Sequence, residues 1–381
     1  MTENILEAKN VFYSYSKKGP IVLNDMNIQI PKGRKTALLG CNGAGKSTLF
    51  SVLNALYKPQ QGQVLYKGTP IKYKKKEIIK MRTEVSILFQ NPNDMMFKPY
   101  VDQDVAYGPE NLKLPKDEVD ARVDEALFAV GMEKFRKAPI MKLSYGQRKR
   151  VTLAGVLAMK PSVMIMDEPT AGLDPQMAYE VMEIAEQLHS SGVTVLLSSH
   201  DTDLVYSWAD EVRVLGGGKC VYAGESEPFY SDWPLVQKSG LMLPSVFKMN
   251  KALADTGNCP LEPYPKSYTQ LSLKTVNHGD TEFGTLHVLK VDTETDINAA
   301  LEAQGLKDME TGIYGMAARV ASNKCEFEPD LRYNGPEGCT MNCLSGKDSV
   351  LICDSSMLDK ALSTIEFSTK NGYGGIKLDI I

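Results

Sequence analysis

Long apolar runs are missing from this sequence of 381 residues. No stretch reaches the roughly 18 consecutive apolar residues that a membrane-spanning helix needs, so we expect any role at a membrane to depend on a partner protein. The first ten residues, MTENILEAKN, lack a basic segment followed by an apolar core. They therefore do not predict a secretory signal, and we expect the protein to stay inside the cell.

The sequence also lacks a large excess of either charge and an ordered set of cysteines. Its net charge of -4 argues against a protein that coats nucleic acid, because such proteins carry a strongly positive surface. Its seven cysteines form an odd number at irregular positions, which favours reduced thiols in a cytoplasm over a disulfide framework. With 43% hydrophobic residues and a length suited to two domains, the chain should form substantial cores.

An α/β pattern occupies residues 1 to about 225. Continuous apolar segments at 36–40 (TALLG), 163–167 (VMIMD) and 194–199 (TVLLSS) are typical of buried strands in a mostly parallel sheet. Between the first two of these segments, apolar residues recur at helical spacing over 116–132, which predicts an amphipathic helix.

The segment GCNGAGKST at 40–48 has the spacing G-x-x-x-x-G-K-[ST] and lies between a predicted strand and a predicted helix. Glycines let the backbone wrap around phosphate, while backbone N–H groups and the helix N-terminus supply positive potential. Lys46 is expected to reach the β- and γ-phosphates, and the Ser47 hydroxyl to hold Mg²⁺. The alternative, a glycine-rich turn with a chance lysine, is disfavoured by the flanking strand and helix. The expected nucleotide contacts of this loop are Gly40, Asn42, Gly43, Ala44, Gly45, Lys46, Ser47 and Thr48.

Two acids and a histidine follow the other buried strands, at the edge where α/β folds bind ligands. Asp167 is placed to bind Mg²⁺ and Glu168 to orient or activate an attacking water, because phosphoryl transfer needs positioning and charge compensation. Taken alone, the acids would read as a solvated strand end and His200 as a structural histidine. Their common edge with Lys46 instead favours a catalytic site in which His200 contacts the γ-phosphate.

The segment LSYGQ at 143–147 has two interpretations. Ser144 and Gln147 have the S-x-x-Q spacing of a capping box, which predicts the start of a helix. A capped helix N-terminus is also an anion site, so the same loop is suited to sensing a nucleotide phosphate. Tyr145 stands where such a loop would have a second glycine, and it gives up the freedom of glycine at positive φ.

In chain order, the phosphate loop, ILFQNP (87–92), LSYGQ, MDEPTAGLDP (166–175) and LLSSH (196–200) resemble the motifs of an ATP-binding-cassette (ABC) ATPase. The resemblance covers roughly residues 5–250. It implies a P-loop NTPase fold with a helical subdomain, in which two cassettes enclose two ATP molecules. Because the chain has one copy of each motif, the resemblance implies a homodimer or a heterodimer with a paralogue.

The same resemblance assigns roles to single residues. It implies that Tyr15 stacks on adenine, that Gln90 senses Mg²⁺ and couples to the membrane subunit, and that Asp174 communicates across the dimer. The implied catalytic residues are Glu168, His200 and Gln90. The implied Mg²⁺ ligands are Ser47, Gln90 and Asp167. The implied nucleotide contacts outside the phosphate loop are Tyr15, Ser144, Gly146, Gln147 and Asp174.

Within that family, residues 87–115 and 240–253 look like the energy-coupling-factor ATPases of cobalt and nickel uptake. This implies a peripheral subunit at the cytoplasmic face of the cell membrane that hydrolyses ATP, with ATP and Mg²⁺ as cofactors. It also implies a transmembrane coupling subunit and a substrate-capture membrane protein as partners, and no nucleic acid. The alternatives are a vitamin-type importer of the same group and a soluble ABC ATPase without a transport role.

We expect an ABC ATPase domain at 1–257, a proline-rich linker at 258–280 and a C-terminal domain at 281–381. Strand–helix–strand twice over suggests that the last domain is α+β and ferredoxin-like. Its predicted strands cover 285–292, 312–321, 350–354 and 375–381. We expect this domain to be an accessory that regulates the ATPase, by metal status or by binding a small molecule, or that holds the dimer together.

Cys339 and Cys343 lie four residues apart in the C-terminal domain, so thiolate ligands for a late transition metal are one interpretation. Two cysteines do not fill a tetrahedral site, and His278 and His287 lie well upstream. Packed, inert thiols are therefore the favoured interpretation.

Overall fold

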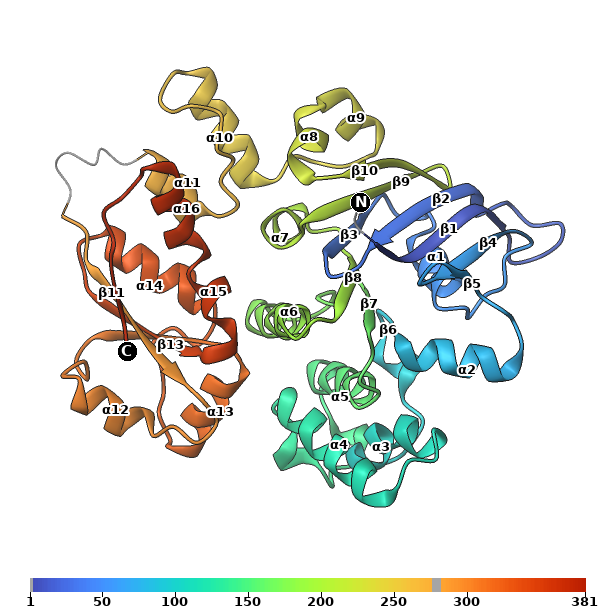
Figure 1. Ribbon diagram of the computed structural model, residues 1–381, viewed down its shortest axis with the longest axis horizontal. Coiled ribbons are helices and arrows are strands. Elements are labelled where there is room, and N and C mark those ends of the chain that lie inside the picture. The colour runs from blue at the N-terminus through green and yellow to red at the C-terminus, as the bar shows by residue number, and fades with distance from the viewer. Residues whose placement is uncertain (1–2, 276–281) are drawn as a thin grey trace. The chain divides into compact units, whose positions relative to one another are not determined.

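The computed structural model describes residues 3–275 and 282–381, and within these the chain forms two compact units. The first unit holds the described residues up to 178 together with 191–243. The second holds 179–190 together with the described residues from 244 onward. Each unit combines sheet and helices (Figure 1). None of the helices in the described part is both long enough and apolar enough to cross a membrane.

A six-stranded sheet in the order β10-β9-β3-β8-β7-β6 forms the centre of the first unit. All neighbouring strands pair in parallel except β9 and β10. The strands β3, β7 and β8 are buried along their whole length, which confirms the three strands predicted from their apolar runs. The strands are β3 (Lys35–Leu39), β6 (Val85–Leu88), β7 (Val163–Asp167), β8 (Thr194–Ser198), β9 (Glu211–Gly216) and β10 (Lys219–Gly224).

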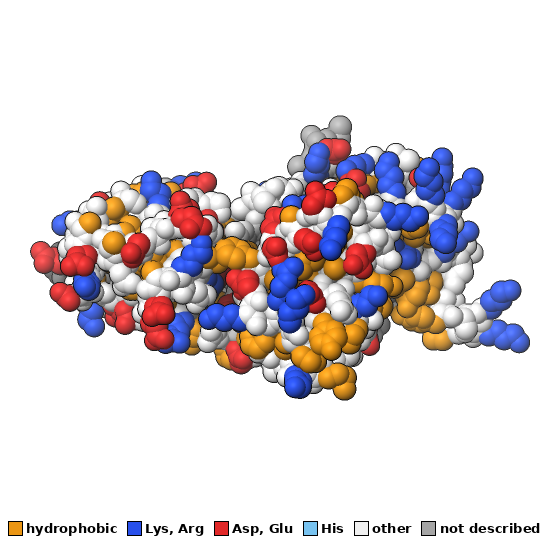
Figure 2. Space-filling view, turned by 90° about the horizontal axis from the view of Figure 1, so that it is seen from below, with side chains coloured by type: hydrophobic (Ala, Val, Ile, Leu, Met, Phe, Trp, Pro, Cys, Tyr) orange, Lys and Arg blue, Asp and Glu red, His pale blue; other side chains and the backbone are white. Residues whose placement is uncertain are grey.

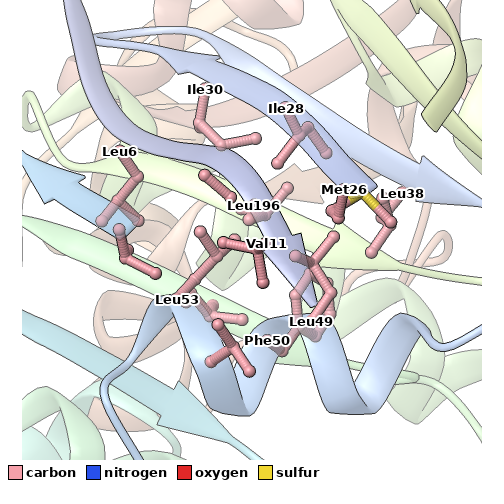
Figure 3. Close-up of a cluster of buried hydrophobic side chains, with 14 of the residues drawn as sticks. Leu6, Val11, Met26, Ile28, Ile30, Leu38, Leu49, Phe50, Leu53 and Leu196 are labelled. Carbon is pink, nitrogen blue, oxygen red and sulfur yellow. The ribbon is translucent and has the colours of Figure 1, made fainter. Parts of the chain in front are cut away.

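A second, antiparallel sheet in the order β2-β1-β4-β5 shares a hydrophobic core with helix α1 (Lys46–Leu53). In Figure 3, Leu49 and Phe50 of α1 point into a cluster that includes Val11 and Leu196. Burying each such side chain contributes about 1.5–3 kcal/mol, so this core fixes the helix that follows the phosphate loop. The strands are β1 (Asn4–Tyr13), β2 (Leu23–Pro31), β4 (Gln61–Tyr66) and β5 (Thr69–Pro70).

A helical subdomain lies between β6 and β7 in the chain (Figure 1). It contains α3 (Val101–Asn111), α4 (Lys116–Ala129) and α5 (Tyr145–Leu157). The apolar face of α4 is buried, which confirms the amphipathic helix expected there. Three short 3₁₀ turns accompany these helices: η1 (Pro92–Met95), η2 (Glu133–Phe135) and η3 (Ile140–Lys142). The unit also contains α2 (Lys75–Glu84), α7 (Thr202–Trp208), α8 (Ser226–Ser231), α9 (Trp233–Lys238) and the first residues of α6 (Pro175–Ser190).

The second unit has a four-stranded sheet in the order β12-β13-β11-β14, and every neighbouring pair is parallel. A ferredoxin-like sheet requires antiparallel pairs, so that prediction is wrong and this part of the chain is an α/β structure. The strands are β11 (Thr285–Val291), β12 (Glu310–Tyr314), β13 (Ser349–Asp354) and β14 (Lys377–Ile380). The helices are α10 (Ser245–Asp255), α11 (Tyr268–Thr275), α12 (Ile297–Ala303), α13 (Met316–Lys324), α14 (Gly335–Leu344), α15 (Leu358–Ala361) and α16 (Ser363–Asn371), with the 3₁₀ turn η4 (Ser355–Met357).

The second unit departs from the predicted topology at two places. The strand expected at 312–321 ends at Tyr314, because Gly315 has a positive φ of 87° and α13 begins at the next residue. Helix α14 occupies a stretch whose glycines argue against a helix, so the sequence does not predict it. Gly335 is required by close packing, since a Cβ there would lie 2.5 Å from the Ile313 carbonyl oxygen.

The segment expected as a linker, 258–280, contains helix α11, and the compact units change at residue 244 rather than at 258. Leu271 and Leu273 of α11 are buried. The Lys274 ammonium donates hydrogen bonds to the Asn250 side chain and to the carbonyls of Leu261 and Pro263. These contacts make residues 250–274 a packed part of the second unit. Residues 276–280 of the expected linker, with His278, lie outside the described residues.

Cys339 and Cys343 are fully buried on α14 and pack against the sheet with Cys353. The described residues contain no group of three or more cysteine, histidine or acidic side chains that could hold a metal. His287 is instead engaged with Asp379, whose Oδ2 lies 2.9 Å from its Nδ1. The buried positions agree with packed, inert thiols.

The buried cysteines should resist a thiol reagent in the native protein at pH 8. Burial raises the pKa of Cys339 to about 11 and those of Cys343 and Cys353 to about 12, so the reactive thiolate is scarce at this pH. The exposed Cys41 supplies the internal control and should be labelled first. Mass spectrometry after brief alkylation measures both. Rapid labelling of Cys339 or Cys343 would contradict packed, inert thiols, and protection of both by added Co²⁺ would support a metal site.

Candidate functional site

The phosphate loop joins the end of β3 to the start of α1. Gly40, Gly43 and Gly45 adopt positive φ values of 147°, 79° and 98°, which favour glycine. At Gly40 a side chain is also excluded by space, because a Cβ would lie 2.8 Å from the Leu215 carbonyl oxygen. The loop conformation therefore depends on the glycines that the motif supplies.

Lys46, Glu168 and His200 meet at the carboxyl edge of the six-stranded sheet. The Lys46 Nζ donates to the Gly40 carbonyl oxygen at 2.7 Å and lies 4.0 Å from the Glu168 Oε1. The His200 Nε2 lies 3.1 Å from the same Oε1 and 3.4 Å from the Lys46 Nζ. Burial lowers the pKa of Lys46 and raises the pKa of Glu168, so both charges are held where water is scarce. Such shifts are common where titratable groups take part in chemistry.

Ser198, at the end of β8, fixes the two acids. Its hydroxyl donates to the Asp167 Oδ1 at 2.7 Å and accepts from the Glu168 backbone N–H at 3.0 Å. Glu168 has a positive φ of 46°, which is uncommon for a residue with a side chain. Backbone strain of this kind clusters at functional sites.

The Glu168 carboxylate has one oxygen without a hydrogen bond. Its Oε2 accepts from the His200 backbone N–H at 3.3 Å. Its Oε1 is buried and accepts no hydrogen bond from the described residues, although the His200 Nε2 lies 3.1 Å away. A buried acceptor that faces a pocket and has no hydrogen bond is suited to binding a water or a ligand.

Lys46, Glu168 and His200 line one pocket of about 350 Å³, a volume within the range of small-molecule sites. At its mouth, the exposed Tyr15 ring is held by edge-on contacts with Tyr13 and Tyr57 and by a 2.8 Å hydrogen bond between its hydroxyl and that of Thr48. This arrangement presents an aromatic face suited to stacking. The lining residues are Tyr15, Val22, Cys41, Asn42, Gly43, Ala44, Gly45, Lys46, Ser47, Thr48, Gln90, Asp167, Glu168 and His200.

Gly40 of the phosphate loop accepts a hydrogen bond from Lys46 but does not itself line this pocket, and the predicted site residues Ser144, Gly146, Gln147 and Asp174 do not line it either. Ser144 and Gln147 form the predicted capping box: the Gln147 N–H donates to the Ser144 Oγ at 3.2 Å and the Ser144 N–H to the Gln147 Oε1 at 2.9 Å. The Asp174 Oδ1 accepts from the Met177 N–H at 2.8 Å near the start of α6. Ser144, Gly146, Gln147 and Asp174 would therefore contact only a nucleotide that is bound outside this chain's own pocket.

A model of the family described as ABC transporter matches residues 23–171. The energy-coupling factor transporter ATP-binding protein EcfA of Methanocaldococcus jannaschii is 47% identical over 258 residues, covering 68% of this chain and 92% of the relative. The chain belongs to the family of energy-coupling factor transporter ATP-binding proteins. It is therefore an ABC ATPase that binds ATP and couples its hydrolysis to transport.

Two further similarities show how much of the chain aligns with a known relative and which solved structure it resembles. EcfA2 of Methanospirillum hungatei is 32% identical over 373 residues and covers 95% of this chain and 93% of the relative, so the alignment includes most of the second unit. A solved structure of CbiO1 from Clostridium perfringens, part of the ABC transporter complex CbiONQ, is 39% identical. It covers 65% of this chain and 99% of CbiO1, with a TM-score of 0.56.

The sequence alone did not single out several residues of the site. Val22 and Cys41 line the pocket, and Ser198 orients both acids. Lys149 is fully buried, and burial lowers its pKa to about 8. Lys149 lies four residues after Tyr145, within the basic run QRKR, and nothing in this run predicts that its side chain is buried. Its neighbours Arg148 and Arg150 are only half-buried.

Proposed function

We propose that this chain is the ATP-hydrolysing subunit of an energy-coupling-factor importer of cobalt, with nickel as the second candidate cargo. The similarity to CbiO1 and the cobalt-type segment at 87–115 support the cargo. The pocket that joins the phosphate loop to Asp167, Glu168 and His200 is the observation that carries the ATPase role. The chain would act as a peripheral subunit at the cytoplasmic face of the membrane.

We propose that Ser47, Asp167 and Gln90 hold Mg²⁺ beside the nucleotide. All three line the pocket, and their hydroxyl, carboxylate and amide oxygens are the hard donors that Mg²⁺ prefers. When bound, the ion would neutralise charge on the phosphates. Lys46 would contact the β- and γ-phosphates, and Tyr15 would stack on the adenine. The Glu168 Oε1 would accept a proton or a hydrogen bond from the attacking water, with His200 beside the γ-phosphate.

The working unit is proposed to be a dimer. The pocket of one chain lacks the signature residues Ser144 and Gly146, and the chain has a single copy of each motif. A second chain, identical or paralogous, would supply its signature loop and Asp174 to complete each pocket. The anion-binding character of the capped α5 N-terminus suits a γ-phosphate from the other chain.

A surface for the membrane partner is proposed on the helical subdomain, which follows Gln90 in the chain. Two segments, 97–102 and 135–141, are joined by backbone hydrogen bonds, among them Ile140 N–H to the Pro99 carbonyl at 2.9 Å. They expose the coupling patch, defined as Phe97, Tyr100, Phe135 and Met141. Met141 is 92% exposed and Phe97 62%. Figure 2 shows hydrophobic side chains at the surface on the side from which it is viewed. Exposed apolar patches commonly mark protein contacts.

Replacing Met141 with glutamate is expected to reduce the coupling subunit recovered with the chain from native membranes by about tenfold, the scale of one interface anchor. The charge would have to be buried against an apolar partner. Ile79 is 49% exposed on α2, and its replacement by glutamate is the matched control that should leave recovery unchanged. Equal recovery with both variants, measured by quantitative mass spectrometry, would remove the coupling patch from the partner site.

We propose that the C-terminal domain expected at 281–381 is an accessory part that restrains the ATPase through α6. Within the second unit, the Arg319 Nη2 lies 2.6 Å from the Glu183 Oε2, and the Gly315 N–H donates to the other oxygen of that carboxylate. The rings of Tyr179 and Tyr333 stack with centroids 5.7 Å apart. Helix α6 begins at Pro175, directly after Asp174. Contacts that keep this helix in place would therefore limit the movement of Asp174, which is proposed to act across the dimer.

Replacing Arg319 with glutamine is expected to raise the basal ATPase rate of the full chain by about two- to fivefold, the range of such couplings. The matched control is Arg332→Gln, because Arg332 is exposed and pairs with Glu328 in the same unit. An unchanged rate in Arg319→Gln, in a protein with a normal melting transition, would argue against restraint through α6.

Purification of the chain from native membranes is the experiment that tests the proposed function. The proposal predicts recovery of two integral membrane proteins, one for coupling and one for substrate capture. A vitamin-type importer would give the same composition but ATP-dependent uptake of a vitamin and none of Co²⁺. Recovery without any integral membrane protein would favour the soluble, non-transport alternative.

A further inference from the structure

The backbone carbonyls of Phe89 and Gln90 lie just beyond the end of β6, and no strand in the described part of the chain pairs with them. Both accept a hydrogen bond from one side chain: the Lys149 Nζ lies 2.6 Å from the Gln90 oxygen and 3.2 Å from the Phe89 oxygen. The Tyr145 hydroxyl lies 3.4 Å from the same Gln90 oxygen. Two donors one turn apart on α5 therefore converge on the backbone of a residue that lines the ATP pocket.

Lys149 is unusual for a lysine because it is 1% exposed and makes no ion pair among the described residues. A buried ammonium normally has a carboxylate partner, since burial of an unpaired charge is costly. Here its described hydrogen bonds go to the two carbonyls of residues 89 and 90. A third contact joins α5 to the same segment, because the Arg148 Nη1 donates to the Asn93 Oδ1 at 3.1 Å.

The Tyr145 ring adds a contact that glycine would lack. A Cβ placed on Gly172 would lie 3.2 Å from the Tyr145 ring, so the ring covers the backbone two residues before Asp174. Next to it, a Cβ on Gly146 would lie 2.2 Å from the Met177 sulfur. The signature loop, the Gln90 segment and the segment before α6 are thus packed as one body within a single chain.

We propose that Lys149 and Tyr145 are positioning residues that hold the Gln90 backbone, so that the signature helix α5 sets the place of the Gln90 side chain in the pocket. The tyrosine in the signature loop is then part of a link between two motifs of the same chain. A shift of α5 would move Gln90 directly. The inference rests on the proposed role of Gln90 toward Mg²⁺, and it adds the two residues through which that role depends on α5.

A double-mutant cycle tests the inference in the full chain. Lys149→Met removes the donor and keeps a side chain of similar length, and it should lower kcat at saturating ATP and Mg²⁺ on the order of tenfold. The dissociation constant for ATP in the presence of EDTA should stay within about twofold, because Lys46 and Tyr15 are untouched. In a Gln90→Ala background the same substitution should have no further effect, because two residues that act through one contact are not additive.

Two further variants control for a general effect of changing α5 and for a failure of Lys149→Met to fold. Arg150→Met is the matched control, since Arg150 lies on the same helix and its Nη1 donates to the Val130 carbonyl, away from Gln90. Its kcat should stay near that of the unmodified chain. Tyr145→Phe removes only the hydroxyl and keeps the ring over Gly172, so it should fold even if Lys149→Met does not. It should lower kcat about two- to threefold, again only while Gln90 is present.

The outcomes separate the inference from the proposed function. An equal loss from Lys149→Met in both backgrounds, or no loss at all, would overturn the positioning role while leaving Gln90 in the site. If Gln90→Ala alone leaves kcat and the Mg²⁺ dependence unchanged, the proposed role of Gln90 fails and the inference fails with it. A loss of kcat that occurs only when Gln90 is present, with ATP binding retained, supports both the positioning role and the proposed role of Gln90.

Discussion

Replacing Glu168 with glutamine is expected to lower the ATP turnover of the chain by at least about a hundredfold, the usual contribution of a general base. Glutamine keeps the shape of the side chain and the acceptor for the His200 N–H, but its amide cannot take a proton from the attacking water. The affinity for ATP should be retained because the phosphate loop and Tyr15 are unchanged. Steady-state phosphate release and equilibrium binding of a fluorescent ATP analogue measure the two effects separately.

Glu84→Gln is the matched control for this substitution. Glu84 is also a partly buried acid of the first unit, but it bonds to Tyr66, Lys67 and Ser162 rather than to the pocket. Its replacement should cost some stability, since hydrogen bonds from these partners lower its pKa in the folded state, and should leave turnover largely intact. Substantial turnover in Glu168→Gln would mean that another group activates the water.

Replacing Lys46 with methionine is expected to weaken ATP binding by about ten- to a hundredfold, the scale of losing a charge-assisted hydrogen bond to phosphate. Methionine keeps the apolar length of the buried stem, and the substitution also removes the bond to the Gly40 carbonyl that ties the loop to its helix. The expected readout is loss of most of the rise in melting temperature that ATP gives, because that rise grows with ligand concentration over Kd.

A surface lysine provides the comparison for Lys46. Lys67 pairs with Glu84 outside the pocket, so Lys67→Met should keep the full thermal response to ATP. If Lys46→Met keeps that response as well, the lysine is not a phosphate ligand in the binding step. If Lys46→Met loses ATP binding while Glu168→Gln retains it, the two substitutions show that Lys46 serves ATP binding and Glu168 serves hydrolysis in the same pocket.

The part of the site that follows from sequence is the part encoded in short, local patterns. Lys46 and Ser47 fall in the pocket because a strand, a glycine loop and a helix in direct succession fix their place. Asp167, Glu168 and His200 converge because the carboxyl ends of parallel strands share one edge. The capping box at Ser144 and Gln147 is a contact over three residues, and the structure confirms it.

What sequence could not give depends on distant neighbours. Lys149 reads as one of three basic residues in a row, and only the tertiary packing of α5 shows that its ammonium reaches the Gln90 carbonyl. Ser198 looks like a strand end until β7 and β8 are placed side by side. In the second unit, Gly335 looked like a loop residue and Gly312 like an ordinary strand residue. Each is instead required where α14 approaches β12 too closely for a Cβ.

ATP-dependent uptake of radioactive Co²⁺ tests the central claim most directly. The measurement uses sealed vesicles that contain the complex purified through this chain, with ATP supplied on the side of the chain. Uptake of Co²⁺ should require ATP and Mg²⁺, should be abolished by Glu168→Gln, and should be reduced by Ni²⁺ if nickel is also a cargo. A complex that hydrolyses ATP but takes up neither ion, or takes them up equally well with Glu168→Gln, would contradict it.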